Sequence, residues 1–393
     1  MNALPDKSNS EHAIEHQILL RISFGDESLE QAERKIPFSR AILPEEAIME
    51  AAEVMRSGWL RQGRYAKLVE EELKKITGAK HAIATSSCTA ALHTCLKLQG
   101  KKGQVAAPAL THPATQNAIC CGGHAPRFVE VDENKYTLSP EGLKEIARKE
   151  KLLGVAPVHV LGIPCSMDDI MAVAQQEGLF VIEDCAQALG SAYNNRSVGR
   201  FGLAGCFSFD AIKPITAGEG GAIISDNDEF VQRARRFIDN GRDCARRHHD
   251  IGLNYKPTDF QMALLLPQLR NLDKIIAGRR EIFGWYNELL DVDGIRTHPE
   301  FSDSTQNCIY YTVRLDKGAL AVHEAMKERG IETKIHPPVN REPVYTFLRQ
   351  RVPRTEQLCE HLLSLPVYPG LTQADAVYVT DSLKVAINEL PCR

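Results

Sequence analysis

Short apolar runs alternate with helical stretches through the middle of this chain, and this alternation limits its possible folds more than any other feature. Seven apolar runs have the length of buried strands: residues 81–84, 104–107, 127–131, 154–160, 179–183, 206–209 and 222–225. Four helical stretches separate the first five: residues 90–98, 113–121, 140–149 and 167–177. Repeated strand–helix units predict an α/β fold, with a mostly parallel sheet and helices on both faces. Ligands of such sheets bind at the carboxyl ends of the strands, so residues there are candidates for chemistry.

Different patterns flank this region. Residues 1–35 are polar and weakly periodic, which predicts an N-terminal extension. Two helices are predicted next, over residues 44–56 and 66–76, because each has apolar residues at helical spacing and a glycine just after its end. The later pattern predicts a long helix, a strand, a helix, a strand and a last helix, at residues 261–290, 309–315, 319–329, 331–335 and 374–390.

The composition excludes several classes of function. The chain has 393 residues with 47 Lys and Arg against 51 Asp and Glu, a formal net charge of -4, so a nucleic-acid partner is not expected. No run approaches the roughly 18 apolar residues that a membrane-spanning helix needs, and the N-terminus lacks the pattern of a secretory signal. The 11 cysteines are odd in number, form no C-x-x-C pair and lie in apolar segments, which favours reduced thiols in a cytoplasmic protein. No metal site is expected.

Two predicted strand ends carry residues that could bind an anion or a ring nitrogen. Residues 85–89 (TSSCT) lie between a strand and a helix, where free backbone N–H groups and the helix dipole can hold an anion. An ordinary helix N-cap uses the same residue types and is the alternative. Asp184 follows a buried strand. It could close a turn, or it could pair with the ring nitrogen of a pyridine cofactor and keep that nitrogen protonated.

Lys213 is the third candidate. It follows the apolar run at residues 206–209 and precedes a glycine cluster at residues 218–221, where the backbone can approach a ligand closely. Most lysines are solvated at the surface, but a desolvated lysine has a lowered pKa and can form a Schiff base with an aldehyde. The position of Lys213 after a buried strand favours this second interpretation.

In their order and spacing these residues resemble one family, the DegT/DnrJ/StrS group of sugar aminotransferases, which depend on pyridoxal 5'-phosphate (PLP). The resemblance covers about residues 36–390. Its motifs are SGWL at 57–60, SCTAAL at 87–92, PALTHPATQNA at 108–118, EDCAQ at 183–187, FSFDAIKPITAGEGG at 207–221, GLNY at 252–255 and SLPVYP at 364–369. The resemblance implies a PLP-dependent type I aminotransferase fold. A large domain at residues 36–262 would hold the mostly parallel sheet, and a smaller α+β domain at residues 263–393 would include the connecting helix.

The resemblance also implies roles at the cofactor ring. Lys213 would be the catalytic residue, holding PLP as a Schiff base and moving a proton between substrate and cofactor. Asp184 would pair with the pyridinium nitrogen, and Gln187 would contact the ring hydroxyl. His112 stands where the family places an aromatic ring on the cofactor face, and imidazole can stack there too.

Four further residues would bind the cofactor phosphate in related enzymes. Ser208, Thr89 and the backbone of Cys88 would hold the phosphate from within one subunit. Cys88 stands where glycine is commonest, which changes little for a backbone contact. Asn254 would reach the phosphate of the neighbouring subunit's cofactor, so the resemblance implies a homodimer with active sites at the interface.

Departures from the family pattern and a basic loop supply candidates for substrate binding. Arg61 stands where a small hydroxyl residue is usual, and it could bind an anionic group or form a surface salt bridge. Lys256 stands where arginine is frequent. Arg246 and His249 belong to a basic loop that could be a solvated face or could bind a nucleotide diphosphate, a sugar carboxylate or glutamate. His336 lies in the small-domain motif that lines the family's cleft, unless it is a plain turn histidine.

The expected function is amino transfer from glutamate to a keto-sugar, which gives an amino sugar for lipopolysaccharide, another surface polysaccharide or a secondary metabolite. The acceptor would be a nucleotide-linked keto-deoxysugar or a free oxidised sugar acid such as an octulosonate. One alternative is a PLP-dependent sugar dehydratase, which has histidine where Lys213 stands. Another is a non-catalytic PLP-binding regulator, which would need a DNA-binding segment that residues 1–35 do not suggest.

Overall fold

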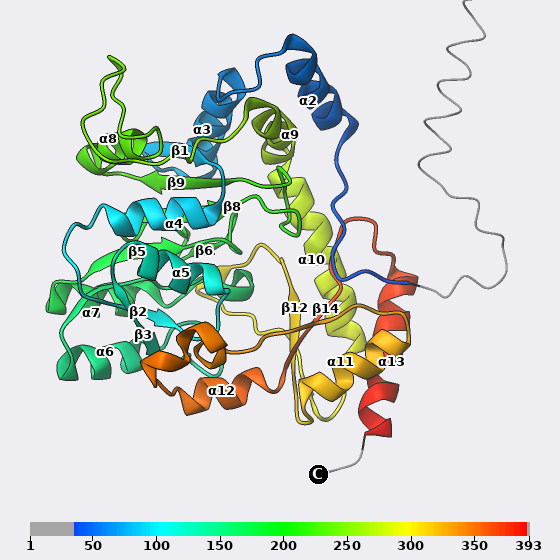
Figure 1. The fold of residues 1–393 in the computed structure, drawn as a ribbon. Helices are drawn as coiled ribbons and strands as arrows, with labels where there is room; N and C mark the ends of the chain where they lie inside the picture. Colours follow the sequence, from blue (N-terminus) through cyan, green and yellow to red (C-terminus); the bar gives the residue numbers. More distant parts are fainter. Residues whose placement is uncertain (1–34, 391–393) are drawn as a thin grey trace, which may run out of the picture. The chain divides into compact units, whose positions relative to one another are not determined.

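A seven-stranded sheet is the largest sheet in this computed structural model, which describes residues 35–390 (Figure 1). The predicted extension at residues 1–35 lies outside the described residues except for Lys35. The strand order is β1-β9-β8-β5-β4-β2-β3. In chain order the strands are β1 (His81–Thr85), β2 (Gln104–Pro108), β3 (Ala125–Val129), β4 (Leu152–Val155), β5 (Phe180–Asp184), β8 (Ala204–Ser208) and β9 (Gly221–Ser225).

The prediction of a mostly parallel sheet is confirmed, with one strand reversed. Strands β3, β2, β4, β5 and β8 pair in parallel, whereas β9 pairs antiparallel with both β8 and β1. The reversal follows from the connection: β8 and β9 are joined by a loop without a helix, and a parallel pair needs a longer crossover. This loop, residues 209–220, carries Lys213.

Two predicted strands are much shorter than expected. The one at residues 331–335 is a strand only at Lys334–Ile335. The apolar run at residues 154–160 is a strand only as far as Val155, where β4 ends. Its second half leaves the ladder, because Val158 forms an isolated bridge with Asp184 and a 3-10 turn, η1 (Val160–Gly162), follows. Leu161 in this turn has a φ of 59°, which a strand cannot accommodate.

Helices cover both faces of the large sheet, as predicted (Figure 1). Strand residues alternate between the faces, so Val105 packs with α4, α5 and α8, whereas its neighbour Ala106 packs with α6 and α7. Near β1 and β9, that second face is covered by α3 and by α9 (Asp259–Arg270). The helices are α2 (Glu45–Ser57), α3 (Arg64–Thr77), α4 (Cys88–Lys97), α5 (Pro113–Cys121), α6 (Pro140–Lys149), α7 (Met167–Glu177) and α8 (Asp228–Phe237).

The predicted single helix at residues 261–290 is wrong, because the segment forms two helices. They are α9 (Asp259–Arg270) and α10 (Leu272–Leu289), separated at Asn271. Pro267 lies inside α9 and lacks the N–H that would continue the helical ladder. The Asn271 side-chain amide donates to the Pro267 carbonyl oxygen at 2.9 Å, so a side chain competes with the backbone at the break.

A second, antiparallel sheet follows in the chain, in the order β10-β12-β14-β13. It packs on α10, α11 and α13 around an apolar cluster of its own. Its elements are β10 (Ile295–Arg296), β12 (Tyr311–Leu315), α11 (Ala319–Glu328), β13 (Lys334–Ile335), η2 (Val339–Arg341), η3 (Pro343–Leu348), α12 (Pro353–Cys359), β14 (Leu362–Leu365) and α13 (Gln373–Glu389). A small third sheet joins β6 (Ala192–Tyr193), β7 (Arg196–Ser197) and β11 (Ser304–Thr305). The boundary between a large and a small domain near residue 262 remains our proposal.

The cysteines behave as small apolar residues. All ten within residues 35–390 are free thiols, and seven of them are buried. This agrees with their placement in apolar segments of the sequence. Across the same residues, the helices are too short or too polar to span a bilayer.

Candidate active site

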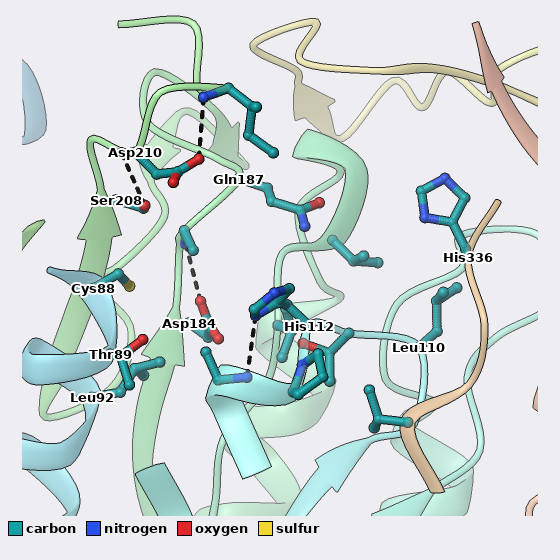
Figure 2. A pocket seen from close by; sticks show the side chains of 18 of the residues that line it. Cys88, Thr89, Leu92, Leu110, His112, Asp184, Gln187, Ser208, Asp210 and His336 are labelled. Carbon is teal, nitrogen blue, oxygen red and sulfur yellow. Dashed lines mark hydrogen bonds between the residues drawn. The ribbon is translucent and has the colours of Figure 1, made fainter. Parts of the chain in front are cut away.

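A cavity of about 520 Å³ opens at the carboxyl ends of the strands of the large sheet and is closed on another side by β13 and the residues after it. Figure 2 shows Cys88 and Thr89 on one side of the cavity and His336 on the opposite side, with Asp184 and His112 between them. The cavity brings together eight of the residues predicted from sequence: Cys88, Thr89, His112, Asp184, Gln187, Ser208, Lys213 and His336.

Asp184 is a buried carboxylate at the end of the central strand β5. Its Oδ2 accepts a hydrogen bond from the Thr115 hydroxyl at 2.7 Å, and its Oδ1 accepts one from the Ala186 backbone N–H at 3.0 Å. Burial raises the pKa of Asp184, and these two hydrogen bonds oppose the shift. A cationic partner arriving from the cavity would complete the pairing of this carboxylate.

A fully buried pair, Glu183 and His159, anchors the strand end beneath Asp184. Both oxygens of Glu183 are occupied: Oε1 accepts from the backbone N–H groups of Phe201 and Gly202, and Oε2 accepts from Gly199 N–H. His159 Nε2 lies 3.1 Å from Oε2, and its Nδ1 accepts from a backbone N–H, so Nε2 carries the ring proton and donates to Glu183.

The backbone of His159 is also bonded directly to Asp184. The His159 backbone N–H donates to the Asp184 carbonyl oxygen at 3.0 Å.

Glu183, His159 and Cys185 lie close enough together to suggest a metal site. Their hydrogen bonds instead occupy the carboxylate oxygens and the imidazole nitrogens that a metal ion would need.

Lys213 reaches the cavity from the loop between β8 and β9. The loop is fixed at its base, because Phe209 N–H donates to the Gly220 carbonyl and Ala217 N–H donates to the Phe209 carbonyl, both at 2.9 Å. Burial lowers the pKa of the Lys213 amine, while Asp210, Cys88 and Asp184 oppose the shift. A lowered pKa increases the fraction of neutral amine, the form that attacks a carbonyl carbon.

The amino end of α4 supplies a place for an anion. The Ser87 hydroxyl caps the helix by accepting from Ala90 N–H at 3.1 Å, and the first helical residues, Cys88 and Thr89, line the cavity. Gly221 of β9 passes so close that a Cβ atom there would lie 2.3 Å from the Ser87 carbonyl carbon. The absence of a side chain at Gly221 therefore allows β9 to support this helix end.

His112 and Gln187 have fixed orientations in the cavity wall. His112 caps α5, and its Nδ1 accepts from Ala114 N–H at 3.2 Å, which leaves the ring proton on Nε2. Burial, followed by the positive charges of Lys213 and Lys334, lowers the pKa of His112 and keeps its ring neutral. The Gln187 carbonyl oxygen accepts from the Leu161 backbone N–H at 2.6 Å, which fixes the direction of its amide group.

Five predicted residues do not line this cavity: Arg61, Arg246, His249, Asn254 and Lys256. Arg61, Arg246 and Asn254 are exposed at the surface of this chain.

Two of the positive charges near Asn254 in the chain, Arg242 and Lys256, are paired with a neighbouring carboxylate. Asp239 binds both Arg242 and Lys256, and Asp243 lies 2.6 Å from His249. The basic loop is therefore partly neutralised within the chain.

Sequence reasoning missed two residues of the site: Thr115, which bonds to Asp184 but does not itself line the cavity, and Lys334, which does. Thr115 lies within a quoted motif, but its bond to Asp184 needs the fold, because the two residues come from different strand–helix units. Lys334 was overlooked although its signal was available. It lies in the predicted strand at residues 331–335, and His336 follows two residues later, a spacing at which extended residues point to the same side.

Comparisons with known proteins agree with this geometry. Residues 42–384 match the model of the DegT/DnrJ/EryC1/StrS aminotransferase family. The chain is 34% identical over 375 residues to the spore coat polysaccharide biosynthesis protein SpsC of Bacillus subtilis (strain 168), covering 89% of this chain and 96% of that protein.

Solved structures show the same fold. The structure of DesI in the presence of its TDP-sugar product is similar with a TM-score of 0.84 and 28% identity, over 93% of this chain and 96% of that one. The aminotransferase PseC of Helicobacter pylori gives a TM-score of 0.86 over 91% of this chain and 100% of that one. At 24% identity, PseC supports the fold alone.

Proposed function

Because the chain belongs to the DegT/DnrJ/EryC1/StrS aminotransferase family, we propose that it transfers an amino group to a keto-sugar, with PLP bound in the cavity of about 520 Å³. One observation carries the proposal. The buried carboxylate of Asp184, the amine of Lys213 and the amino end of α4 come from distant parts of the chain and line the same cavity.

The residues of the cavity fit PLP, the cofactor of this family. The amino end of α4 and the Ser208 hydroxyl suit a phosphate, since helix N-termini bind anions. Asp184 suits a protonated ring nitrogen, because its buried carboxylate has just two hydrogen-bond donors within the described chain. Lys213 suits the aldehyde, because burial favours its neutral form.

Each of these side chains then has a task. PLP when bound supplies an aldehyde that bonds to amines and a pyridinium ring that withdraws electrons from the substrate carbon. Asp184 holds the proton on the ring nitrogen, and Lys213 takes and returns the proton at the substrate carbon. The neutral ring of His112 would pack against the cofactor, and the Gln187 amide would bind its ring hydroxyl. The amino end of α4, with Cys88 and Thr89, and the Ser208 hydroxyl would hold its phosphate.

The proposed donor is glutamate, and the proposed acceptor is either a nucleotide-linked keto-deoxysugar or a free oxidised sugar acid such as an octulosonate. The TDP-sugar product named with DesI supports the first acceptor class. The name of SpsC supports a product for a surface polysaccharide, with lipopolysaccharide or a secondary metabolite as the other destinations. The free thiols of residues 35–390 support a cytoplasmic enzyme.

We also propose a homodimer. Helix α2 buries Ala47, Ala51 and Val54 but leaves Met49, Met55 and neighbouring apolar residues exposed. Trp59, just after this helix, is 64% exposed, and Ile251, beside Asn254, is 96% exposed. Large apolar side chains that are exposed together along α2 and at the residues just after it are typical of an interface.

In this dimer Asn254 and the substrate candidates Arg61, Lys256, Arg246 and His249 act at the partner's cavity. Mixing two inactive variants, Lys213→Ala and Asn254→Ala, tests the arrangement. Random exchange of subunits would give mixed dimers with one intact site each, so about a quarter of the wild-type activity would return. If the mixture stays inactive after exchange, Asn254 does not act across the interface.

The spectrum of the enzyme tests the main proposal. The PLP-loaded protein should absorb visible light, glutamate should bleach that band, and a suitable keto-sugar should restore it. Lys213→Ala should abolish both the band and turnover, whereas Lys80→Ala, a surface variant paired with Asp228, should change neither. Unchanged turnover in Lys213→Ala would disprove the assignment.

The presence of Lys213 also argues against the sugar dehydratase. A bleached band followed by amino-sugar formation would exclude the regulator.

A further inference from the structure

Lys334 is a second lysine in the wall of the active-site cavity. It belongs to β13, and it lines the cavity together with His336, two residues further along the chain. Lys213 and Lys334 are the two lining residues of lysine or arginine type among residues 35–390. The mechanism described above uses Lys213 and gives no role to Lys334.

The contacts of Lys334 are aromatic and leave its charge without a counterion. Its Nζ lies 4.7 Å from the centre of the Tyr310 ring and 5.9 Å from that of Phe38. Its hydrogen-bond contact is long, at 3.5 Å to the Tyr310 hydroxyl oxygen. Over residues 35–390, it forms no ion pair with a carboxylate within 4.0 Å.

Lys135 shows what a comparable lysine looks like when its charge is paired. Its Nζ also lies over two aromatic rings, 5.4 Å from the centre of Tyr193 and 4.9 Å from that of Phe301. In addition, Asp303 Oδ2 lies 2.8 Å from the Lys135 amine. The aromatic surroundings are therefore alike, and the missing element at Lys334 is a carboxylate.

The groups around Lys334 do not supply that charge. Burial, then the positive charge of Lys213, lowers the pKa of Lys334 to about 8, and the carboxylate of Asp210 opposes the shift without forming an ion pair. His336 is bonded through Nε2 to the Ser364 hydroxyl at 2.7 Å, and burial lowers its pKa to about 3, so its ring is neutral. A partly buried cation without a counterion is costly, which favours an anion that arrives with a ligand.

We propose that Lys334 binds a carboxylate group of a substrate and thereby selects carboxylate-bearing partners for the reaction. The inference rests on the proposed function, and it goes further by naming the residue and the chemical group. A single lysine suits a singly charged carboxylate, while the phosphate has its own site at the amino end of α4. The carboxylate can come from the amino donor or from an acid sugar as acceptor, and the two half-reactions distinguish these sources.

The test compares three variants of the PLP-loaded enzyme. Lys334→Met keeps the length and the aromatic contacts but removes the charge. Lys334→Arg keeps a positive charge, and Lys135→Met is the matched control outside the cavity. For each, the visible spectrum gives the half-saturating concentration and the limiting rate, first for L-glutamate and then for acid and neutral keto-sugars.

We expect Lys334→Met to raise the half-saturating concentration of the carboxylate-bearing partner by about tenfold to a hundredfold, the effect of losing one hydrogen bond to a charged group. The limiting rate and the half-saturation by a neutral keto-sugar should change little, and Lys334→Arg should retain most of the affinity. A rise with glutamate identifies the donor as the source. A rise with the sugar acid identifies the acceptor.

The outcomes against the inference are equally distinct. The role of Lys334 is overturned if Lys334→Met has the wild-type half-saturating concentration for glutamate, and if acid sugars either show no change in theirs or are not used at all. An equal loss for neutral and acid sugars also overturns it, because that pattern indicates a structural effect. If Lys334→Met does not fold, Lys334→Gln repeats the comparison. A wild-type enzyme whose band responds to no donor would instead refute the proposed function.

Discussion

The hydrogen bond from Thr115 to Asp184 should set the pH below which the protein stops binding PLP. The Thr115 hydroxyl lies 2.7 Å from Asp184 Oδ2, and both side chains are buried. Valine has nearly the same shape as threonine but cannot donate. Thr115→Val therefore removes this bond and leaves Asp184 with the single donor at Ala186 N–H.

The size of the expected pKa shift follows from the charge of the acceptor, the Asp184 carboxylate. A hydrogen bond to a charged group contributes about 1.5–3 kcal/mol. Since one pKa unit corresponds to about 1.36 kcal/mol, the pKa of Asp184 should rise by about 1–2 units in the variant. The direction is upward because the lost bond stabilises the ionised carboxylate. As the solution is acidified, Asp184 in the variant therefore loses its negative charge at a higher pH than Asp184 in the wild type.

The assay is the dissociation constant of PLP, measured from the absorbance of the bound cofactor between about pH 4 and pH 8. Affinity should fall on the acid side as Asp184 becomes protonated, and this fall should lie about 1–2 units higher in Thr115→Val. Other groups, including the cofactor phosphate, titrate in both proteins. The difference between the two profiles therefore isolates Asp184.

Thr77→Val is the matched control. The Thr77 hydroxyl is also buried and donates at 2.7 Å, but its acceptor is the neutral Leu73 carbonyl oxygen in α3. This control should leave the acid side of the profile where it is in the wild type. Coincident profiles for Thr115→Val and the wild type would refute the reasoning about Asp184.

Three other results are expected. Glu183→Gln replaces the oxygen that accepts from His159 and Gly199 with an NH₂ group, which leaves two buried donors unpaired. At about 1–3 kcal/mol for each donor, the free energy of unfolding of the cofactor-free protein should fall by about 2–6 kcal/mol in thermal denaturation. Gly221→Ala should weaken PLP binding at least about tenfold in spectral titration, because its Cβ would lie 2.3 Å from the Ser87 backbone. Gly278→Ala has open space and should leave PLP binding unchanged. As the pH increases past about 8, Lys334 loses its charge, so the half-saturating concentration of a carboxylate-bearing substrate should increase. In Lys334→Arg, which keeps its charge, this increase should be absent.

Local features of the fold were readable from sequence because they depend on neighbours in the chain. The predicted bounds of α5, α6 and α7 agree with the structure, since proline at the first turn of α5 and α6 and glycine after α7 mark helix ends. The reversed strand β9 and the break between α9 and α10 were not predicted. The first depends on how a loop returns to the sheet, and the second on a side chain competing for one carbonyl oxygen.

Part of the candidate site could also be predicted from the sequence, and part of it could not. Lys213, Asp184 and the residues at the amino end of α4 stand at strand ends, where a parallel sheet brings ligand-binding groups together. Their type and order in the chain resemble those of one aminotransferase family, which implied a PLP site, and the family match agrees with that resemblance. The chemistry of the reaction is thus encoded locally, in a few residues that follow apolar runs.

Charge pairing was decided by the tertiary structure, because it depends on residues far apart in the chain. The basic loop was the strongest substrate signal in the sequence, but Asp239 pairs with its Arg242, and Asp243 contacts its His249. Lys334 was overlooked in the sequence, and it became a candidate when the fold placed it in the cavity beside Tyr310, without an ion pair to a carboxylate. Spacing along a chain predicts helices, strands and their ends. Whether a charge is compensated is settled by the folded molecule, since electrostatic energy depends on distance and burial in space.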